Sequence, residues 1–366
     1  MLEQPEMTET NYMKHSRLLV LALLALVAAV SSSLPAYAAP DITILATGGT
    51  IAGSAETQTQ AGYTSGQVGV ETLLAAVPQL KELADVSGEQ VVNVGSQDMS
   101  DAIWLDLASR INTLLATKKT EGIVITHGTD TIEETAYFLN LVVDSDKPVV
   151  MTAAMRPSTA LSADGPLNIY NAVAVAADIR ASGRGVLVVA NDDIHSARAV
   201  TKTNTTDVQT FVSPERGLIG TTLYGKNTFF RTPYRAHTSG SDFSLKGVKA
   251  LPRVDIIYMH ANFSADIIDA AVANGAKGLV IAGVGNGNMT TEAQAAVARA
   301  TGAGVAVVRS SRVVSGATGR NVETDDDKLG TVASGELNPA KARVLLKLAL
   351  LTTKDASDIQ AMFDKY

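Results

Sequence analysis

Short apolar runs rich in β-branched residues recur along most of this chain, and a polar turn and a helix-compatible segment follow each one. The runs are continuously apolar instead of alternating, which is typical of strands that are buried on both faces of a parallel sheet. They occupy residues 42–46, 122–126, 148–151, 185–190, 254–258, 278–282 and 304–308. This pattern predicts an α/β fold with a doubly wound, mainly parallel sheet, in which ligands bind beyond the carboxyl ends of the strands.

A polar stretch at 231–252 interrupts this alternation and predicts two domains. We expect a larger N-terminal α/β domain over 39–230, a linker over 231–252 and a smaller C-terminal α/β domain over 253–366. Helix signals agree with this scheme, because Asp98 or Ser100 can cap a helix that carries Trp104, and Asn338 precedes a proline at the start of another.

The first 38 residues predict a secretory signal peptide. A basic segment at 13–17 precedes an apolar run at 18–30, and Ala36 and Ala38 form an A-x-A cleavage signature. The run of thirteen residues is shorter than the ~20 that span a bilayer, so an uncleaved anchor is the weaker alternative. We therefore expect a mature chain from Ala39 in the periplasm or outside the cell. Residues 1–12 carry three glutamates, which is unusual before a signal peptide and makes Met13 a candidate start.

Composition excludes several classes of function. The chain has no cysteine, so thiolate metal sites, iron–sulfur clusters, disulfides and a cysteine nucleophile are ruled out. Its 30 Lys and Arg against 37 Asp and Glu give a net charge of −7, which does not favour binding to the negatively charged backbone of a nucleic acid. The five histidines show no H-x-x-x-H spacing, which argues against a metal site. The glycines of 46–54 fit neither the G-x-x-x-x-G-K-[ST] nor the G-x-G-x-x-G motif of nucleotide-binding proteins. We expect no metal and no cofactor.

Polar side chains gather where three of the predicted strands end. Thr50 follows the first strand, Thr129 and Asp130 follow the second, and Lys202 follows the segment after a later one. Each has an ordinary interpretation alone: a turn threonine, a helix-capping aspartate, a solvated lysine. Together they provide a hydroxyl, an acid and a lysine, which can activate a hydroxyl nucleophile without a Ser-His-Asp triad.

The strand-end segments also carry a family resemblance. ATGGTIAGS at 46–54 and ITHGTDTIEETAYF at 125–138 resemble the two signature segments of the bacterial asparaginase/glutaminase family, in its type II periplasmic branch. Similarity continues through GSQDM at 95, AMRPSTALSADGP at 154, TKTNTTD at 201, AGVGNGN at 282 and LNPAKARVLL at 337. The resemblance covers essentially the whole mature chain.

The resemblance implies a threonine amidohydrolase. Thr50 would attack the side-chain amide of asparagine, ammonia would leave, and water would hydrolyse the acyl-enzyme. Tyr63 and the group of Thr129, Asp130 and Lys202 are both candidates for the base that activates Thr50, and the sequence leaves this open. The oxyanion hole is expected at backbone N–H groups near two turn glycines, Gly49 and Gly128. His127 lies in a signature segment, but we expect a structural hydrogen-bonding role for it.

The resemblance also implies how the amino-acid substrate is bound. Ser96, Gln97 and Asp98 would hold its ammonium and carboxylate groups by charge-assisted hydrogen bonds, and Ala154 would also lie at the substrate. Asn288 and Glu323 would come from a neighbouring subunit of a homotetramer.

Asn288 stands where strong glutaminases of the family tend to have serine, so asparagine is the expected substrate and glutamine a weaker one. The alternative is a periplasmic amino-acid binding protein without catalysis, for which the surplus hydroxyls and Lys202 would be unnecessary.

Overall fold

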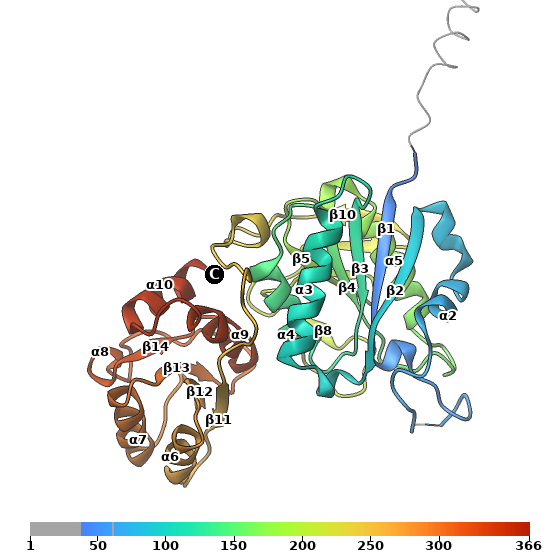
Figure 1. Ribbon diagram of the computed structural model, residues 1–366. Coiled ribbons are helices and arrows are strands. Elements are labelled where there is room, and N and C mark those ends of the chain that lie inside the picture. The colour runs from blue at the N-terminus through green and yellow to red at the C-terminus, as the bar shows by residue number, and fades with distance from the viewer. Residues whose placement is uncertain (1–37, 61) are drawn as a thin grey trace, which may run out of the picture. The chain divides into compact units, whose positions relative to one another are not determined.

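The computed structural model describes residues 38–60 and 62–366. They contain one large sheet, one smaller sheet and a two-stranded sheet of β7 (Thr201–Lys202) and β8 (Phe211–Val212) (Figure 1). The predicted signal peptide lies outside the described residues, except for Ala38. Within the described residues, the longest apolar helices fall short of what a membrane crossing requires. Residues 40–366 form one compact unit.

The large sheet has eight strands in the order β10-β9-β6-β5-β4-β3-β1-β2. The central strands are parallel to one another, and three shorter strands extend the sheet antiparallel at one side. The parallel strands are β1 (Asp41–Gly48), β2 (Asp85–Val94), β3 (Gly122–Thr126), β4 (Val149–Thr152) and β5 (Val186–Ala190). The antiparallel strands are β6 (Asp193–Ser196), β9 (Gly220–Leu223) and β10 (Lys226–Phe229).

Helices cover both faces of this sheet, as doubly wound topology requires. One face packs against α3 (Asp101–Leu115) and α4 (Ile132–Val142), and the other packs against α2 (Val70–Ala75) and α5 (Gly165–Ala176). Alternation along β3 assigns its side chains to the two layers: Ile123 and Ile125 belong to the first cluster and Val124 to the second.

A crevice is expected where neighbouring strands send their next helix to opposite faces. β1 and β3 are hydrogen-bonded neighbours, with Ala46 opposite Thr126. The helix after β1 is α2, and the helix after β3 is α4, on the other face. The carboxyl ends of β1 and β3 therefore form the switch point at which such folds bind ligands.

The small sheet has four parallel strands in the order β11-β12-β13-β14. They are β11 (Val254–Tyr258), β12 (Gly278–Gly283), β13 (Ala306–Ser311) and β14 (Thr331–Ala333). α6 (Asp266–Ala273) and α7 (Thr291–Gly302) cover one face. α9 (Pro339–Ala349) and α10 (Ala356–Lys365) pack with the core of the large sheet, and α8 (Asp326–Leu329) precedes β14.

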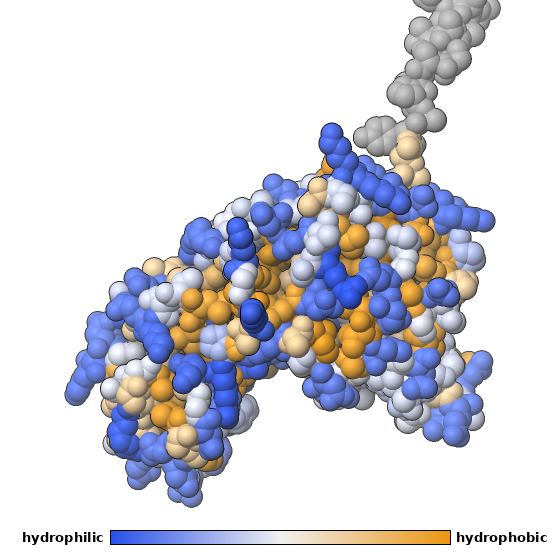
Figure 2. Space-filling model, viewed as in Figure 1, coloured by the Kyte–Doolittle hydropathy of each residue, from blue (hydrophilic) through white to orange (hydrophobic). Residues whose placement is uncertain are grey.

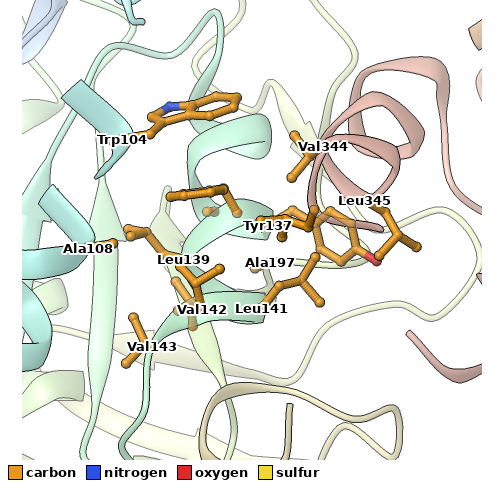
Figure 3. Packing of buried hydrophobic residues seen from close by; sticks show 14 of the residues in the cluster. Trp104, Ala108, Tyr137, Leu139, Leu141, Val142, Val143, Ala197, Val344 and Leu345 are labelled. Carbon is orange, nitrogen blue, oxygen red and sulfur yellow. The ribbon is translucent and has the colours of Figure 1, made fainter. Parts of the chain in front are cut away.

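One hydrophobic cluster joins the two sheets. Tyr137 and Leu141 of α4 pack with Val344 and Leu345 of α9 in a single buried core (Figure 3). Lys347 of α9 also donates to Asp101, at the start of α3, at 2.6 and 2.8 Å. Apolar packing between α4 and α9 and a partly buried ion pair between α3 and α9 thus connect the two sheets.

The predicted α/β class and the two sheets are confirmed, while several details differ. Ser100 caps α3 by accepting from the Ile103 amide, so the alternative cap at Asp98 is wrong. Asn338 caps α9 as predicted, with Pro339 in its first turn. The strands β2, β6, β9, β10 and β14 were not expected from apolar runs.

Candidate active site

Two strand-end turns meet in backbone contact at the switch point. Gly49 follows β1 with φ of 80°, and a Cβ built on it would lie 2.4 Å from the Cα of Gly128, which follows β3. A side chain at position 49 would therefore separate the turns. The Gly49 N–H itself donates to the carbonyl of Val94 at 2.9 Å, so an oxyanion donor near Gly49 would have to be a neighbouring N–H group. The amide of Gly128 is without an acceptor among the described residues and stays a candidate.

Thr50 and Tyr63 contact each other through a loop that folds back on the end of β1. Thr50 begins the short 3-10 helix η1 (Thr50–Ala52) and is 6% exposed. Ser54 and Thr64 pair through backbone hydrogen bonds of 3.1 and 3.0 Å, which closes the loop. Tyr63 Oη then lies 2.6 Å from Thr50 Oγ1. A buried threonine hydroxyl thus has a phenol in direct hydrogen-bond contact.

A second polar cluster lies at the end of β3. Lys202, on β7 (Thr201–Lys202), donates to Thr129 Oγ1 at 2.9 Å and to Asp130 Oδ1 at 2.6 Å. Asp130 makes no capping bond to α4, whose N-cap residue is Thr131. Because the ammonium donates to the Thr129 oxygen, the hydroxyl proton of Thr129 is left to be donated to a bound molecule.

Ser96 connects this cluster to the end of β2. Its hydroxyl accepts from the Asp130 amide at 3.2 Å, and its carbonyl accepts from Thr131 Oγ1 at 2.7 Å. Ser96 begins η3 (Ser96–Asp98), a single 3-10 turn. These bonds hold the end of β2 against the turn that follows β3.

The two clusters line one open cavity of about 410 Å³. Its walls are Gly49, Thr50, Gly62, Tyr63, Ser65, Ser96, Gln97, Gly128 and Asp130. Thr129 and Lys202 adjoin it through Asp130. Most predicted site residues are therefore brought together from four chain segments.

Besides Thr129 and Lys202, which adjoin the cavity, four predicted residues do not line it. Asp98 is exposed beside it and accepts a long hydrogen bond of 3.4 Å from Gln97. Ala154 is buried next to Gly165 at the start of α5, behind η1. Asn288 and Glu323 lie at loops of the small sheet, where the Asn288 amide donates to the Glu323 carboxylate.

A buried ion pair fixes the loops that carry Asn288 and Glu323. Arg309 of β13 and Asp326 of α8 are 1% and 0% exposed and form two bonds of 2.6 Å. Arg309 also donates to the carbonyl of Asn286 at 3.1 Å and to that of Gly319 at 2.9 Å. One guanidinium thus joins the turn before Asn288 to the segment before Glu323.

His127 belongs to a buried hydrogen-bond chain behind the cavity, which confirms its expected structural role. Burial lowers its pKa to about 4, so the ring is neutral at pH 7. Nδ1 lies 2.8 Å from the carbonyl of Gly128, which can only accept, so Nδ1 carries the proton. Nε2 must then accept from Thr135 at 3.0 Å, and the Thr135 oxygen accepts from the Trp104 indole at 2.9 Å. This chain fixes the orientation of the Gly128 peptide.

Sequence reasoning missed residues that shape the cavity. Ser65 and Gly62 line it, and the only available signal was a hydroxyl two positions after Tyr63. Ser158 and Thr159 anchor the Tyr63 loop: Ser158 donates to the Gly53 carbonyl at 2.7 Å, and Thr159 accepts from the Ala55 amide at 2.9 Å. These contacts explain why the segment at 154 belongs with the site.

Comparisons with known proteins agree on one family. The family models "Asparaginase, N-terminal" and "Glutaminase/Asparaginase C-terminal domain" match residues 41–235 and 253–363. The chain is 57% identical to L-asparaginase 2 of Escherichia coli K12, over 94% of this chain and 98% of that protein. It is 45% identical to a glutaminase-asparaginase of Pseudomonas fluorescens biotype A, over 89% of this chain and 90% of that one.

A solved structure extends this similarity to the fold. The crystal structure of a probable cytoplasmic L-asparaginase from Campylobacter jejuni matches with a TM-score of 0.87 and 47% identity, over 89% of this chain and all of that one. The matched models span both sheets and all the strand-end segments described above. This chain belongs to the asparaginase/glutaminase family.

Proposed function

We propose that this protein hydrolyses L-asparagine to L-aspartate and ammonia through a threonine acyl-enzyme, with weaker hydrolysis of L-glutamine. The observation that carries the proposal is the 2.6 Å contact between the buried Thr50 hydroxyl and Tyr63, in a cavity whose opposite wall holds the Thr129–Lys202–Asp130 cluster. Family membership makes the chain an amidohydrolase of the L-asparaginase type.

In the proposed reaction, Thr50 Oγ1 forms a bond to the amide carbon of the substrate. Tyr63 accepts the Thr50 proton while its own phenolic proton passes to the departing amide nitrogen, so the C–N bond breaks, ammonia leaves and the phenol stays neutral. Water then attacks the ester, one proton of the water returns through Tyr63 to Thr50 Oγ1 as the ester bond breaks, and aspartate leaves. Direct contact favours Tyr63 over Lys202 for this proton transfer, because the Lys202 ammonium is already donating to both of its partners.

The opposite wall of the cavity provides polar groups for binding the substrate. Thr129 accepts from Lys202, so its own proton points to another acceptor, and Asp130 provides a carboxylate at the cavity. We assign the substrate ammonium to Asp98 and the substrate carboxylate to Ser96, which leaves the Gly128 amide as the candidate oxyanion donor. One methylene separates glutamine from asparagine and is worth only about 1–3 kcal/mol in discrimination, which is why some glutaminase activity is expected.

The test compares two substitutions at the nucleophile. Thr50→Ala is expected to lower kcat for ammonia release from asparagine by about 10³-fold or more, while aspartate still binds by calorimetry. Thr50→Ser keeps a hydroxyl and is the matched control, with partial activity expected. Near-normal turnover of Thr50→Ala would remove Thr50 as nucleophile, and absence of ammonia release from the wild type would leave an amino-acid binding protein.

We also propose a homotetramer in which Asn288 and Glu323 complete the cavity of a neighbouring subunit. Both lie on loops held by Arg309, and neither lines the cavity of its own chain. Exposed apolar side chains such as Ile256, on strand β11, give the assembly a surface to bury. The face in Figure 2 shows hydrophobic patches among hydrophilic residues.

A periplasmic or secreted location is proposed from the signal sequence. A relative from Haemophilus influenzae, 52% identical over 89% of this chain and 93% of that protein, is named a probable periplasmic L-asparaginase, whereas the solved Campylobacter jejuni protein is named cytoplasmic. N-terminal sequencing of the protein from fractionated cells tests the location, with Ala39 expected as the first residue.

A further inference from the structure

A second cavity, of about 140 Å³, lies apart from the candidate active site and is strongly basic. Arg198, Arg216, Arg231 and Arg235 line it, and none of its lining residues in the described chain is acidic. On the same measure a water molecule needs roughly 10–15 Å³, so the cavity has room for a polyatomic ion. Such a concentration of arginine is unexpected in a chain of net charge −7.

The arginines carry more positive charge than their partners neutralise. Arg198 and Arg216 share one carboxylate, that of Glu336, at 2.9 and 3.1 Å. Arg231 donates its Nε to the carbonyl of Leu218 at 2.8 Å. Neither Arg231 nor Arg235 forms an ion pair with a described residue. Two guanidinium charges are therefore left without a carboxylate.

Buried donors without acceptors lie in the same region. The Nε of Arg235 is buried and no acceptor among residues 38–60 and 62–366 reaches it. The hydroxyl of Tyr137, which is 0% exposed, is likewise unpaired in the described chain. Burial raises the pKa of Tyr137, and the nearby Arg198 and Arg235 oppose that rise. Tyr137 lies one helical turn before Asn140, which lines the cavity.

The cavity walls are held in place by contacts of their own. The ring of Tyr234 lies 5.3 Å from the guanidinium of Arg216 and 5.4 Å from that of Arg235, so one aromatic side chain supports both cations. Arg184 donates to the carbonyl of Arg231 and, at 2.7 Å, to Thr232. The arginines are thus arranged before any ligand arrives, which lowers the cost of binding.

We propose that this cavity binds a small oxyanion, such as inorganic phosphate, chiefly through Arg231 and Arg235. Planar guanidinium groups match the paired oxygens of phosphates and carboxylates, and unpaired buried N–H donors gain most from such an acceptor. An anion there would connect Arg198, in the turn before Lys202, with Arg231 and Arg235, in the segment that follows β10. We therefore expect it to stabilise the fold.

The experiment measures the thermal unfolding temperature of the full-length protein at pH 7, with inorganic phosphate or succinate added and ionic strength balanced by sodium chloride. The wild type is expected to show a saturable rise with the anion, because a ligand that binds only the native state stabilises it. Arg235→Gln is expected to lose that rise. Arg299→Gln removes an exposed arginine that pairs with Asp269 elsewhere, and is the matched control that keeps it.

The variants separate this cavity from the active site, where succinate could also bind. Anion bound in the active site raises the unfolding temperature of both proteins. The difference in that rise between the wild type and Arg235→Gln therefore comes from binding in the basic cavity. A difference for phosphate only identifies a phosphate site, and a difference for succinate only identifies a carboxylate site. If Arg235→Gln fails to fold, Arg231→Gln gives the same comparison. Equal responses of the wild type and the variants to both anions, or no saturable response of the wild type, would overturn the proposal.

Discussion

Single residues set the local chemistry through what surrounds them. Thr50 and Thr129 are both buried hydroxyls at strand ends, but one contacts a phenol and the other an ammonium. The phenol next to Thr50 can accept a proton from its hydroxyl, whereas the ammonium next to Thr129 can only donate one. The sequence identified both threonines because hydroxyls at strand ends are conspicuous. It could not identify Ser65, since nothing in the sequence closes the loop that brings it to the cavity.

Buried histidines make the stability of this protein sensitive to acid. Burial lowers the pKa of His195 to about 4, with Lys341 adding to the effect, and burial also lowers that of His127 to about 4. The unfolded chain takes up these protons near pH 6.5, while the folded chain stays neutral. Stability is therefore full above pH 6.5 and falls as the pH drops towards 4, by about 3 kcal/mol per histidine.

Urea unfolding at a series of pH values checks this prediction. His195→Gln is expected to be less stable at pH 7 but to lose less free energy of unfolding between pH 6.5 and 4 than the wild type. His260→Gln changes an exposed ring and is the control. The same pH dependence in wild type and His195→Gln would contradict the assignment to His195.

At the scale of elements, continuous apolar runs predicted the buried strands well. The run at 122–126 coincides with β3, which is buried along its whole length. The run at 254–258 coincides with β11, but β11 is an edge strand on which Ile256 and Tyr258 are exposed, so the expected burial on both faces is wrong there. β2 was missed because it is an edge strand, where Ser87, Gly88 and Glu89 interrupt the apolar pattern and exposure is tolerated. β14 has only three residues, too few to show any periodicity.

The loops of the small sheet depend on the buried Arg309–Asp326 pair. Arg309→Met leaves the Asp326 carboxylate buried and unpaired, so a loss of about 3–5 kcal/mol is expected. The double variant Arg309→Met/Asp326→Leu removes both charges and is expected to recover much of that stability. It still lacks the guanidinium that joins the two loops, so its KM for asparagine is expected to stay raised if Asn288 and Glu323 complete the cavity.

Melting temperatures and steady-state kinetics of the two variants distinguish these effects. The exposed pair of Arg299 and Asp269, changed in the same way, is the control for removal of an ion pair. A double variant with wild-type KM would show that the pair serves stability alone.

At the scale of the whole molecule, the sequence predicted two sheets but not how they pack. The spacing of apolar residues along a helix indicates which of its faces is buried. It does not indicate which other element packs against that face. α4 and α9 are separated by almost two hundred residues, and their contact depends on complementary shapes at Tyr137 and Leu345. The Asp101–Lys347 bond is equally non-local. Neither could be deduced from local pattern.

The proposed assembly predicts that two inactive subunits can restore each other. Thr50→Ala lacks the nucleophile, and Glu323→Ala lacks a residue that would act in a neighbouring cavity. Mixed and allowed to exchange subunits, they are expected to recover part of the activity, because some hybrid sites contain both intact residues. Ammonia release after mixing is the measurement, and native mass spectrometry verifies the exchange. Exchange without recovered activity would argue against shared cavities.

The contact between Gly49 and Gly128 has a consequence for how this enzyme type can diversify. Because position 49 has no space for even a methyl group, the turn that carries Thr50 and the turn that carries Thr129 must keep a fixed backbone position relative to each other. A substitution at Gly49 would separate these two turns. The loop before Asn288 has a restraint of the same kind, because a Cβ on Gly283 would lie 2.4 Å from the backbone of Gly287. Variation is therefore expected in the side chains at positions 288 and 323 and not in the backbone that carries them.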